Sequence, residues 1–184
     1  MDTKNGPASR IISSVKPGEN KNPVAFVLVG LPGSGKSTWA RNHPRRLAIA
    51  SSDHYIRQIA VSEGLAYKEA FEQHNKKSFS LMKERVKSLV RDGKSFIWDQ
   101  VNLTRKKRAS IYGLLHRTHR VVFVVFLTPP EICWQRNLER NEREGQGIDR
   151  QRFEMLVKLL TVPDETEPHD RIIRVGHATW HDKT

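Results

Sequence analysis

The sequence VLVGLPGSGKSTWARN, residues 27–42, joins an apolar run to a helix-like segment through a loop that is rich in glycine. The loop follows the pattern G-x-x-x-x-G-K-[ST], with Gly30, Gly35, Lys36 and Ser37 at the fixed positions. In this pattern, successive backbone N–H groups converge on a phosphate, and the following helix adds its positive N-terminal dipole. A strand before the loop and a helix after it are the context that the pattern requires. The sequence therefore predicts a site for the triphosphate of a nucleotide.

The loop residues divide into those that bind phosphate through the backbone and those that act through a side chain. We expect Lys36 to place its ammonium group on the terminal phosphates of ATP. We expect the Ser37 hydroxyl to occupy one coordination site on the Mg²⁺ that accompanies ATP. Glycine is needed because side chains would block the approach of the phosphates. The expected nucleotide site comprises Gly30, Leu31, Pro32, Gly33, Ser34, Gly35, Lys36, Ser37 and Thr38.

Outward from the loop, short apolar runs alternate with helix-like segments. Strands are expected at residues 24–30, 47–50, 95–98, 121–127 and 171–175. Helices are expected at residues 36–43, 67–92, 105–117, 131–143 and about 153–160. The inner face of the longest helix is expected to carry Phe71, Asn75, Phe79, Met82, Val86 and Leu89. This alternation predicts an α/β fold with a five-stranded parallel sheet between helices and right-handed crossovers.

The length of the chain allows one domain with a full hydrophobic core. Residues 1–22 are polar and lack apolar periodicity, so we expect a flexible basic tail there, a folded domain over residues 23–178 and a short tail over residues 179–184. No apolar run is long enough to cross a bilayer, and the N-terminus lacks the apolar block of a secretory signal. The single cysteine, Cys133, allows no internal disulfide. These features predict a cytoplasmic protein without a membrane partner.

The chain carries 32 Lys and Arg against 20 Asp and Glu, a formal net charge of +12. Such a charge favours polyanions through counterion release and electrostatic steering, which makes nucleic acid, and DNA first, the expected partner. The alternatives are a solubilising surface or a nucleotide enzyme that needs positive charge only for ATP. The cluster RKKR at residues 105–108 begins a predicted helix, where four cations oppose the helix dipole. We therefore expect Arg105 and Arg108 to contact the nucleic acid.

Two aspartates directly follow predicted strands. Asp53 follows the strand at residues 47–50, and Asp99 follows the strand at residues 95–98. In doubly wound sheets, ligands bind beyond the carboxyl ends of the strands. A carboxylate there can accept a proton from an attacking hydroxyl, or hold the Mg²⁺ shell and the attacking group in line. The alternative is that each aspartate only caps a helix, as Asp53 would do for the segment HYIRQIA.

Four segments, GLPGSGKSTWAR, SSDHYIRQ, WDQVNLTRKKR and QRNLER, resemble in order and spacing the kinase domain of the phage polynucleotide kinases. They are more loosely similar to the related domain of heterogeneous nuclear ribonucleoprotein U. The resemblance covers about residues 24–160. It implies a P-loop fold of the nucleoside monophosphate kinase type with an arginine-bearing lid, and ATP-dependent transfer of a phosphoryl group to an alcohol.

The resemblance also implies roles for individual residues. Asp53 would be the general base for the acceptor hydroxyl, and Arg57 would contact the acceptor phosphate. Arg140 would lie on the lid and stabilise charge on the transferring phosphoryl group. Asp99 and Asn102 fall on a D-x-x-N variant of the family and would orient the acceptor.

The sequence departs from this family on the acceptor side. The family often has Asp-Asp-Tyr-Arg where this chain reads DHYIR from Asp53 to Arg57, and Val101 stands where threonine is usual. A very basic kinase without a phosphatase domain is also similar to the phage kinases that phosphorylate the 5-hydroxymethyl group of 5-hydroxymethyluracil in DNA. That hydroxyl is the favoured acceptor, and the chain would then act in the host cytoplasm. The alternatives are a 5′-hydroxyl polynucleotide kinase, a small-molecule P-loop kinase, and a binding module that has lost transfer.

Overall fold

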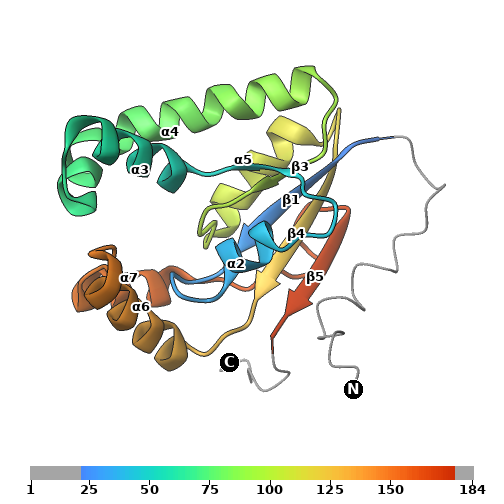
Figure 1. Ribbon diagram of the computed structural model, residues 1–184. Helices are drawn as coiled ribbons and strands as arrows, with labels where there is room; N and C mark the ends of the chain where they lie inside the picture. The colour runs from blue at the N-terminus through green and yellow to red at the C-terminus, as the bar shows by residue number, and fades with distance from the viewer. Residues whose placement is uncertain (1–21, 177–184) are drawn as a thin grey trace, which may run out of the picture.

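The computed structural model describes residues 22–176 and contains one five-stranded sheet (Figure 1). The strands are β1 (Val24–Val29), β2 (Ala48–Ala50), β3 (Phe96–Trp98), β4 (Arg120–Phe126) and β5 (Arg171–Val175). The helices are α2 (Lys36–Arg41), α3 (Ser52–Glu63), α4 (Tyr67–Arg91), α5 (Arg105–Leu115), α6 (Pro130–Glu144) and α7 (Arg150–Leu159). The strand order is β2-β3-β1-β4-β5 and every pairing is parallel, which confirms the predicted sheet. The tails expected at residues 1–22 and 179–184 fall almost entirely outside the described residues.

Side chains of the central strands alternate between two helical layers. Val27 of β1 packs with Met82 of α4 and Ile111 of α5, whereas its neighbour Leu28 packs with Ala40 of α2 on the opposite face. Successive residues of a strand point to opposite faces, so covering both faces requires an almost wholly apolar strand. That requirement explains the uninterrupted apolar runs in the sequence. Among residues 22–176, no helix has the length and hydropathy needed to cross a membrane.

Two helical pairs extend beyond the carboxyl ends of the strands and face each other (Figure 1). One pair is α3 with the beginning of α4, which pack through Ile56 and Ala70. The other pair is α6 and α7, where Cys133 and Phe153 pack against Leu31 of the glycine loop. The loop therefore lies at the base of a space that is walled by both pairs.

The sequence predicted the buried face of α4 correctly for the C-terminal part of the helix but not for its N-terminal part. Met82 and its C-terminal neighbours on that face are buried against the sheet as expected, but Asn75 is exposed and Ser78 is buried instead. The first turns of α4 pack on α3 rather than on the sheet, so a different side of the helix is covered there. As a result, Phe71 and Phe79 are only partly buried.

Arg108 corrects the prediction made for the RKKR cluster. Its side chain is 0% exposed, forms an ion pair with Glu167, and donates to the carbonyls of Asn102 at 3.1 Å and Leu103 at 2.7 Å. A buried and fully engaged guanidinium does not reach a nucleic acid, so the predicted substrate contact is wrong for Arg108. Arg105 is exposed, and it donates to both the carbonyl and the hydroxyl of Thr166 at 2.7 Å.

The Arg108–Glu167 pair ties the segment before β5 to α5, and its loss has an expected cost. We expect Glu167→Ala to lower the free energy of unfolding by about 3–5 kcal/mol, because the Arg108 charge would stay buried without its partner. Urea denaturation measures this. The neighbouring Glu165→Ala removes an exposed carboxylate and is expected to change stability by about 0.5 kcal/mol or less. Equal effects of the two substitutions would contradict a stabilising role for the buried pair.

Candidate active site at the carboxyl edge of the sheet

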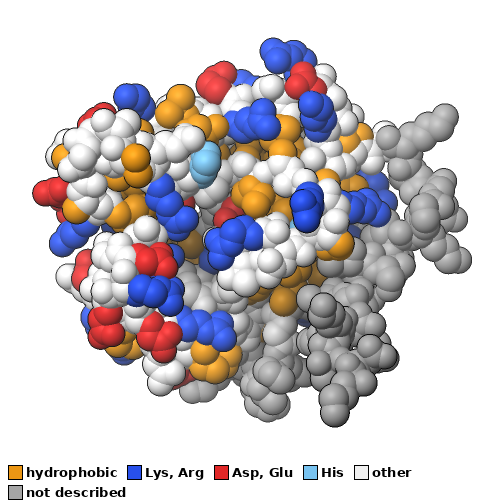
Figure 2. Space-filling model, in the orientation of Figure 1, with side chains coloured by type: hydrophobic (Ala, Val, Ile, Leu, Met, Phe, Trp, Pro, Cys, Tyr) orange, Lys and Arg blue, Asp and Glu red, His pale blue; other side chains and the backbone are white. Residues whose placement is uncertain are grey.

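A cavity of about 1580 Å³ opens at the carboxyl ends of the strands, between the α3–α4 pair and the α6–α7 pair. Figure 2 shows this hollow with Lys and Arg side chains around its rim. Its lining brings together most of the predicted site, namely loop residues 32–38, Asp53, Arg57, Asp99, Asn102 and Arg140. Gly30, Leu31, Arg105 and Arg108 lie outside the lining.

Two glycines of the loop are required for different reasons. Gly33 has a φ of +83°, and a Cβ added there would lie 2.4 Å from the Cys133 carbonyl oxygen in α6. Gly35 has a φ of +97°, with no atom within 4 Å of an added Cβ. Gly33 thus allows α6 to pack directly on the loop. Gly35 gives the loop its left-handed turn beside open space, where backbone N–H groups can meet a phosphate.

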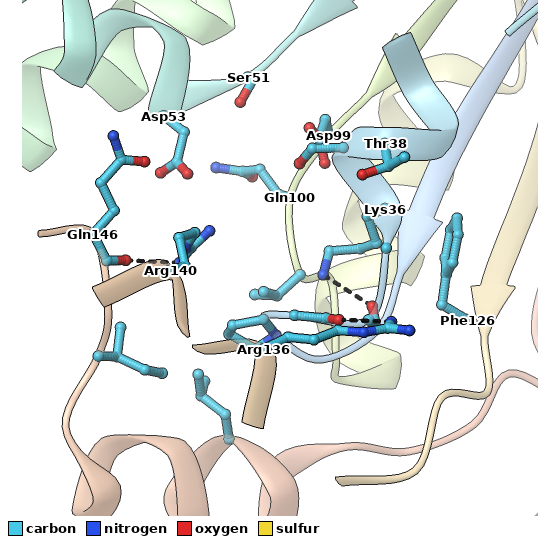
Figure 3. Close-up of a pocket in the computed structure, with 18 of the residues that line it drawn as sticks. Lys36, Thr38, Ser51, Asp53, Asp99, Gln100, Phe126, Arg136, Arg140 and Gln146 are labelled. Atoms are coloured by element: carbon cyan, nitrogen blue, oxygen red, sulfur yellow. Dashed lines mark hydrogen bonds between the residues drawn. The ribbon is translucent and has the colours of Figure 1, made fainter. Parts of the chain in front are cut away.

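Lys36 lies inside the loop that precedes it. Its Nζ donates to the Leu31 carbonyl at 2.6 Å and lies 3.4 Å from the Ser34 Oγ (Figure 3). Only 7% of the residue is exposed, and burial lowers its pKa to about 8 although the nearby Asp99 favours the charged form. The phosphates of ATP would supply the negative charge that this buried ammonium lacks.

Nucleotide binding is therefore expected to take up a proton at alkaline pH. At about pH 9 the free protein holds Lys36 mostly neutral, and phosphate oxygens would restore its charge, whereas at pH 7 the lysine is already charged. Calorimetric titration of ATP with EDTA, in buffers of different ionisation enthalpy, measures the uptake. Lys36→Met should abolish it. Uptake that persists in this variant would show that another group titrates.

Ser37 and Asp99 form the part of the site that suits a divalent cation. The Ser37 hydroxyl lies near the Asp99 carboxylate, and both residues line the cavity. Burial raises the pKa of Asp99, although the Ser37 hydroxyl and the charge of Lys36 oppose the rise. A hydroxyl and a carboxylate beside phosphate oxygens are the ligands that Mg²⁺ takes in kinases, where the ion neutralises charge on the β- and γ-phosphates. The residues present thus fit Mg²⁺ bound with ATP.

Asp53 lies in the first turn of α3 and faces the cavity (Figure 3). Ser51 occupies the N-cap position without a capping side-chain hydrogen bond, so Asp53 is not the helix cap. Its Oδ1 accepts a hydrogen bond from the Tyr67 hydroxyl at 2.8 Å. Burial and the Asp53 charge raise the pKa of Tyr67, which keeps the phenol protonated as a donor. One face of the Asp53 carboxylate is thereby fixed in position.

Three arginines form hydrogen bonds at α6 and the turn that follows it, which together are named the lid. Arg140 donates to the Gln146 carbonyl at 2.8 Å, and the Gln146 side chain accepts from Arg57 of α3 at 3.0 Å across the cavity. Arg136 reaches the Gly33 carbonyl at 3.3 Å (Figure 3). The Nε of Arg140 is buried without a partner among the described residues. Arg140 lines the cavity, and this unused donor leaves its guanidinium with capacity for a further acceptor.

Asn102 has a more structural place than the sequence indicated. It is 2% exposed with a φ of +43°, and its amide nitrogen donates to the carbonyls of Leu28 at 2.8 Å and Gln100 at 3.3 Å. These bonds connect the end of β1 to the loop that carries Asp99. Only the Asn102 Oδ1, which has no partner among the described residues, is left for another group.

Four residues of the site described above were not predicted as site residues from the sequence, namely Tyr67, Gln100, Arg136 and Gln146. Gln100 links two strand ends, since it accepts from the Trp98 indole and donates to the Ser52 hydroxyl, each at 3.2 Å. No local sequence pattern identifies Tyr67 or Gln100 as a residue of the site. Gln146 lies between Gly145 and Gly147, and that spacing could have identified it as the tip of a turn.

The fold and the site together define an α/β domain with a P-loop and a five-stranded parallel sheet. A protein-family model described as an AAA domain matches residues 26–163, and the chain belongs to that family.

The chain is also similar to individual proteins of known sequence. The chain is 25% identical over 173 residues to heterogeneous nuclear ribonucleoprotein U-like protein 2 of Mus musculus, a match that covers 89% of this chain and 23% of that protein. It therefore spans less than a quarter of the length of this relative.

Two solved structures share the fold. A putative kinase from Chloroflexus aurantiacus J-10-fl superimposes with a TM-score of 0.64 at 13% identity, over 85% of this chain and 86% of that chain. A chain of the Pnkp1/Rnl/Hen1 RNA repair complex superimposes with a TM-score of 0.61 at 24% identity, over 80% of this chain and 47% of that chain. At these identities the likeness shows a common fold.

Proposed function

We propose that this protein transfers the γ-phosphoryl group of ATP to a hydroxyl group on nucleic acid. The observation that carries the proposal is the meeting of two sets of residues across one cavity. Lys36 and Ser37 of the loop and Arg140 of the lid line it from the nucleotide side, and Asp53 and Arg57 of α3 line it from the other side. A phosphoryl donor and an acceptor alcohol could therefore meet in line between them.

The proposed reaction assigns one task to each group. Asp53 accepts the proton of the acceptor hydroxyl as its oxygen forms a bond to the γ-phosphorus, and the bond from that phosphorus to the bridging oxygen breaks to release ADP. Lys36 binds the β- and γ-phosphates throughout. Arg140 turns its unpaired Nε and its remaining N–H groups to the charge on the transferring phosphoryl group. Arg57 binds the phosphate next to the acceptor.

The charge of the cavity supports a polyanionic acceptor. Its lining carries nine Lys and Arg side chains against six of Asp and Glu, and the whole chain has a net charge of +12. A small neutral acceptor such as a sugar would not require positive charge beyond the phosphate loop. The fold shared with a chain of an RNA repair complex also supports a nucleic-acid substrate.

The first candidate acceptor is the 5-hydroxymethyl group of 5-hydroxymethyluracil in phage DNA, and the 5′-hydroxyl of DNA or RNA is the alternative. Radiolabelled ATP with three acceptors separates them: a 5′-hydroxyl oligodeoxynucleotide, a 5′-hydroxyl oligoribonucleotide, and a 5′-phosphorylated DNA that contains 5-hydroxymethyluracil. The matched control is the same 5′-phosphorylated DNA with thymine in place of the modified base. Label on the modified DNA but not on its control supports the base hydroxyl.

Two other outcomes would replace the proposal. Label on nucleosides or sugars, with none on any oligonucleotide, would identify a small-molecule kinase. ATP binding without transfer to any acceptor would identify a nucleotide-binding module.

A further inference from the structure

Aromatic side chains of α4 line the cavity at increasing distance from Asp53. Tyr67 and Phe71, four residues apart, lie on the same side of the helix, and Phe79 lies two turns further on, rotated by about 80° from Phe71. The Tyr67 ring stacks on Phe71 with 6.3 Å between ring centroids, while its hydroxyl contacts Asp53. The row of aromatic side chains therefore begins at the proposed general base and leads away from it.

Each phenylalanine of this row has a cation on its ring. The Arg152 guanidinium of α7 lies 4.9 Å from the Phe71 centroid, so it crosses the cavity from the opposite wall. Lys83 and Lys107 both lie over Phe79, at 4.7 Å and 4.8 Å from its centroid. Contacts of this kind stabilise an exposed cation by only about 0.5–1 kcal/mol.

These three cations have no carboxylate partner. Within residues 22–176, no side-chain nitrogen of Arg152, Lys83 or Lys107 lies within 4.0 Å of a carboxylate oxygen of Asp or Glu, and only the backbone N–H of Arg152 donates to Asp149. Burial and the neighbouring Lys83 both lower the pKa of Lys107, as expected for two ammonium groups that share one ring. An anion placed between these two lysines would relieve their repulsion. The row of rings and cations thus suits a ligand in which phosphate groups alternate with flat apolar surfaces.

We propose that Phe71, Phe79, Lys83, Lys107 and Arg152, here named the α4 strip, bind the unpaired polynucleotide strand that carries the acceptor nucleotide. The cations bind backbone phosphates, and the rings hold the cations in place and offer apolar surface to the bases. This inference rests on the proposed function, because it extends the acceptor side of the same cavity. It adds the substrate class: a single-stranded segment several nucleotides long.

The geometry sets the length of that segment. The helical rise from Tyr67 to Phe79 is about 18 Å. Nucleotides stacked at about 3.4 Å each would cover that distance with roughly five residues. A dinucleotide would therefore reach Asp53 and Arg57 without reaching Lys83 or Lys107.

A length series tests this expectation. The acceptors are single-stranded oligodeoxynucleotides from dinucleotide to dodecamer, each with a 5′-hydroxyl and with 5-hydroxymethyluracil as the second nucleotide, so that both proposed hydroxyls are present. We expect kcat/KM to rise with length up to roughly five nucleotides and then to level off. A dodecamer annealed to its complement should be a poorer acceptor. Constant kcat/KM across the series, or equal use of the duplex, would overturn the inference.

Charge variants with a matched control locate the effect. The double substitution Lys83→Gln with Lys107→Gln should lower the slope of log kcat/KM against log salt by about 1.4 for the dodecamer, and leave the dinucleotide unchanged. The control is Lys77→Gln with Lys106→Gln, which removes the same charge from exposed positions of the same two helices that do not lie over the Phe79 ring. Equal losses in both pairs would overturn the inference.

Failure of the strip can be separated from failure of the proposed function. If no oligonucleotide accepts label, the proposed function fails. Anisotropy of a fluorescein-labelled single-stranded dodecamer, measured without ATP, then still tests the strip. Weaker binding by the Lys83 and Lys107 variant than by its control supports the strip, and equal binding overturns it.

Discussion

An Asp53→Asn protein is expected to lose about 100- to 10,000-fold in kcat and to bind ATP as tightly as the parent protein. The amide is nearly isosteric and can still accept the hydrogen bond from Tyr67, so the surrounding structure should remain. It cannot take the proton of the attacking hydroxyl. Single-turnover transfer to the best acceptor and equilibrium titration of ATP measure the two quantities separately.

The control for this substitution is Asp92→Asn, at the C-cap of α4 and outside the cavity lining. It is expected to leave kcat unchanged. Full activity in the Asp53 variant would assign proton transfer to another group, of which Asp99 would be the first to test.

Arg140→Gln is expected to lower kcat by about 1,000-fold or more, the range found for arginines that stabilise a transferring phosphoryl group. The guanidinium contacts Gln146 through one amino group and keeps its buried Nε without a partner. Glutamine is neutral and too short to supply that donor. Because the stabilisation acts mainly in the transition state, KM for ATP should change much less than kcat.

Arg143→Gln provides the comparison for Arg140. Arg143 lies on the same helix and also lines the cavity, but its guanidinium pairs with Glu144 and is largely exposed. We expect a change of less than about threefold, in keeping with the weak contribution of exposed ion pairs. If both substitutions reduced kcat equally, the effect would come from the net charge of the lid rather than from a contact with the phosphoryl group.

The strands and the loop could be predicted because their signals are local. The apolar run of β1, the glycines and Lys36 are adjacent in sequence, and Lys36 bonds to the Leu31 carbonyl within the same loop. The bounds of α3 were not predicted, since only Ile56, Ile59 and Ala60 are buried within it and Val61 is 85% exposed. Too few apolar positions face inward there to produce a clear helical period.

The RKKR cluster shows why local patterns did not identify the cations along the cavity. Arg108 turns inward because Glu167, far along the chain, provides its buried partner. Its neighbour Lys107, displaced by about 100° on the helix, lines the cavity instead. Which of the two side chains turns inward therefore depended on Glu167, a residue 59 positions away from Arg108 that no local sequence pattern includes.

The sequence by itself determined the phosphate loop and the presence of five parallel strands, and with them a nucleotide site at the carboxyl edge of the sheet. These features follow from backbone conformation and from the two-sided burial of apolar strands, which near neighbours control. Only the tertiary structure decided that Tyr67 meets Asp53, that Gln146 joins Arg57 to the lid, and which basic side chains face the cavity. Such contacts depend on the packing of separate helices against one another, and the period of a single helix does not specify its partners.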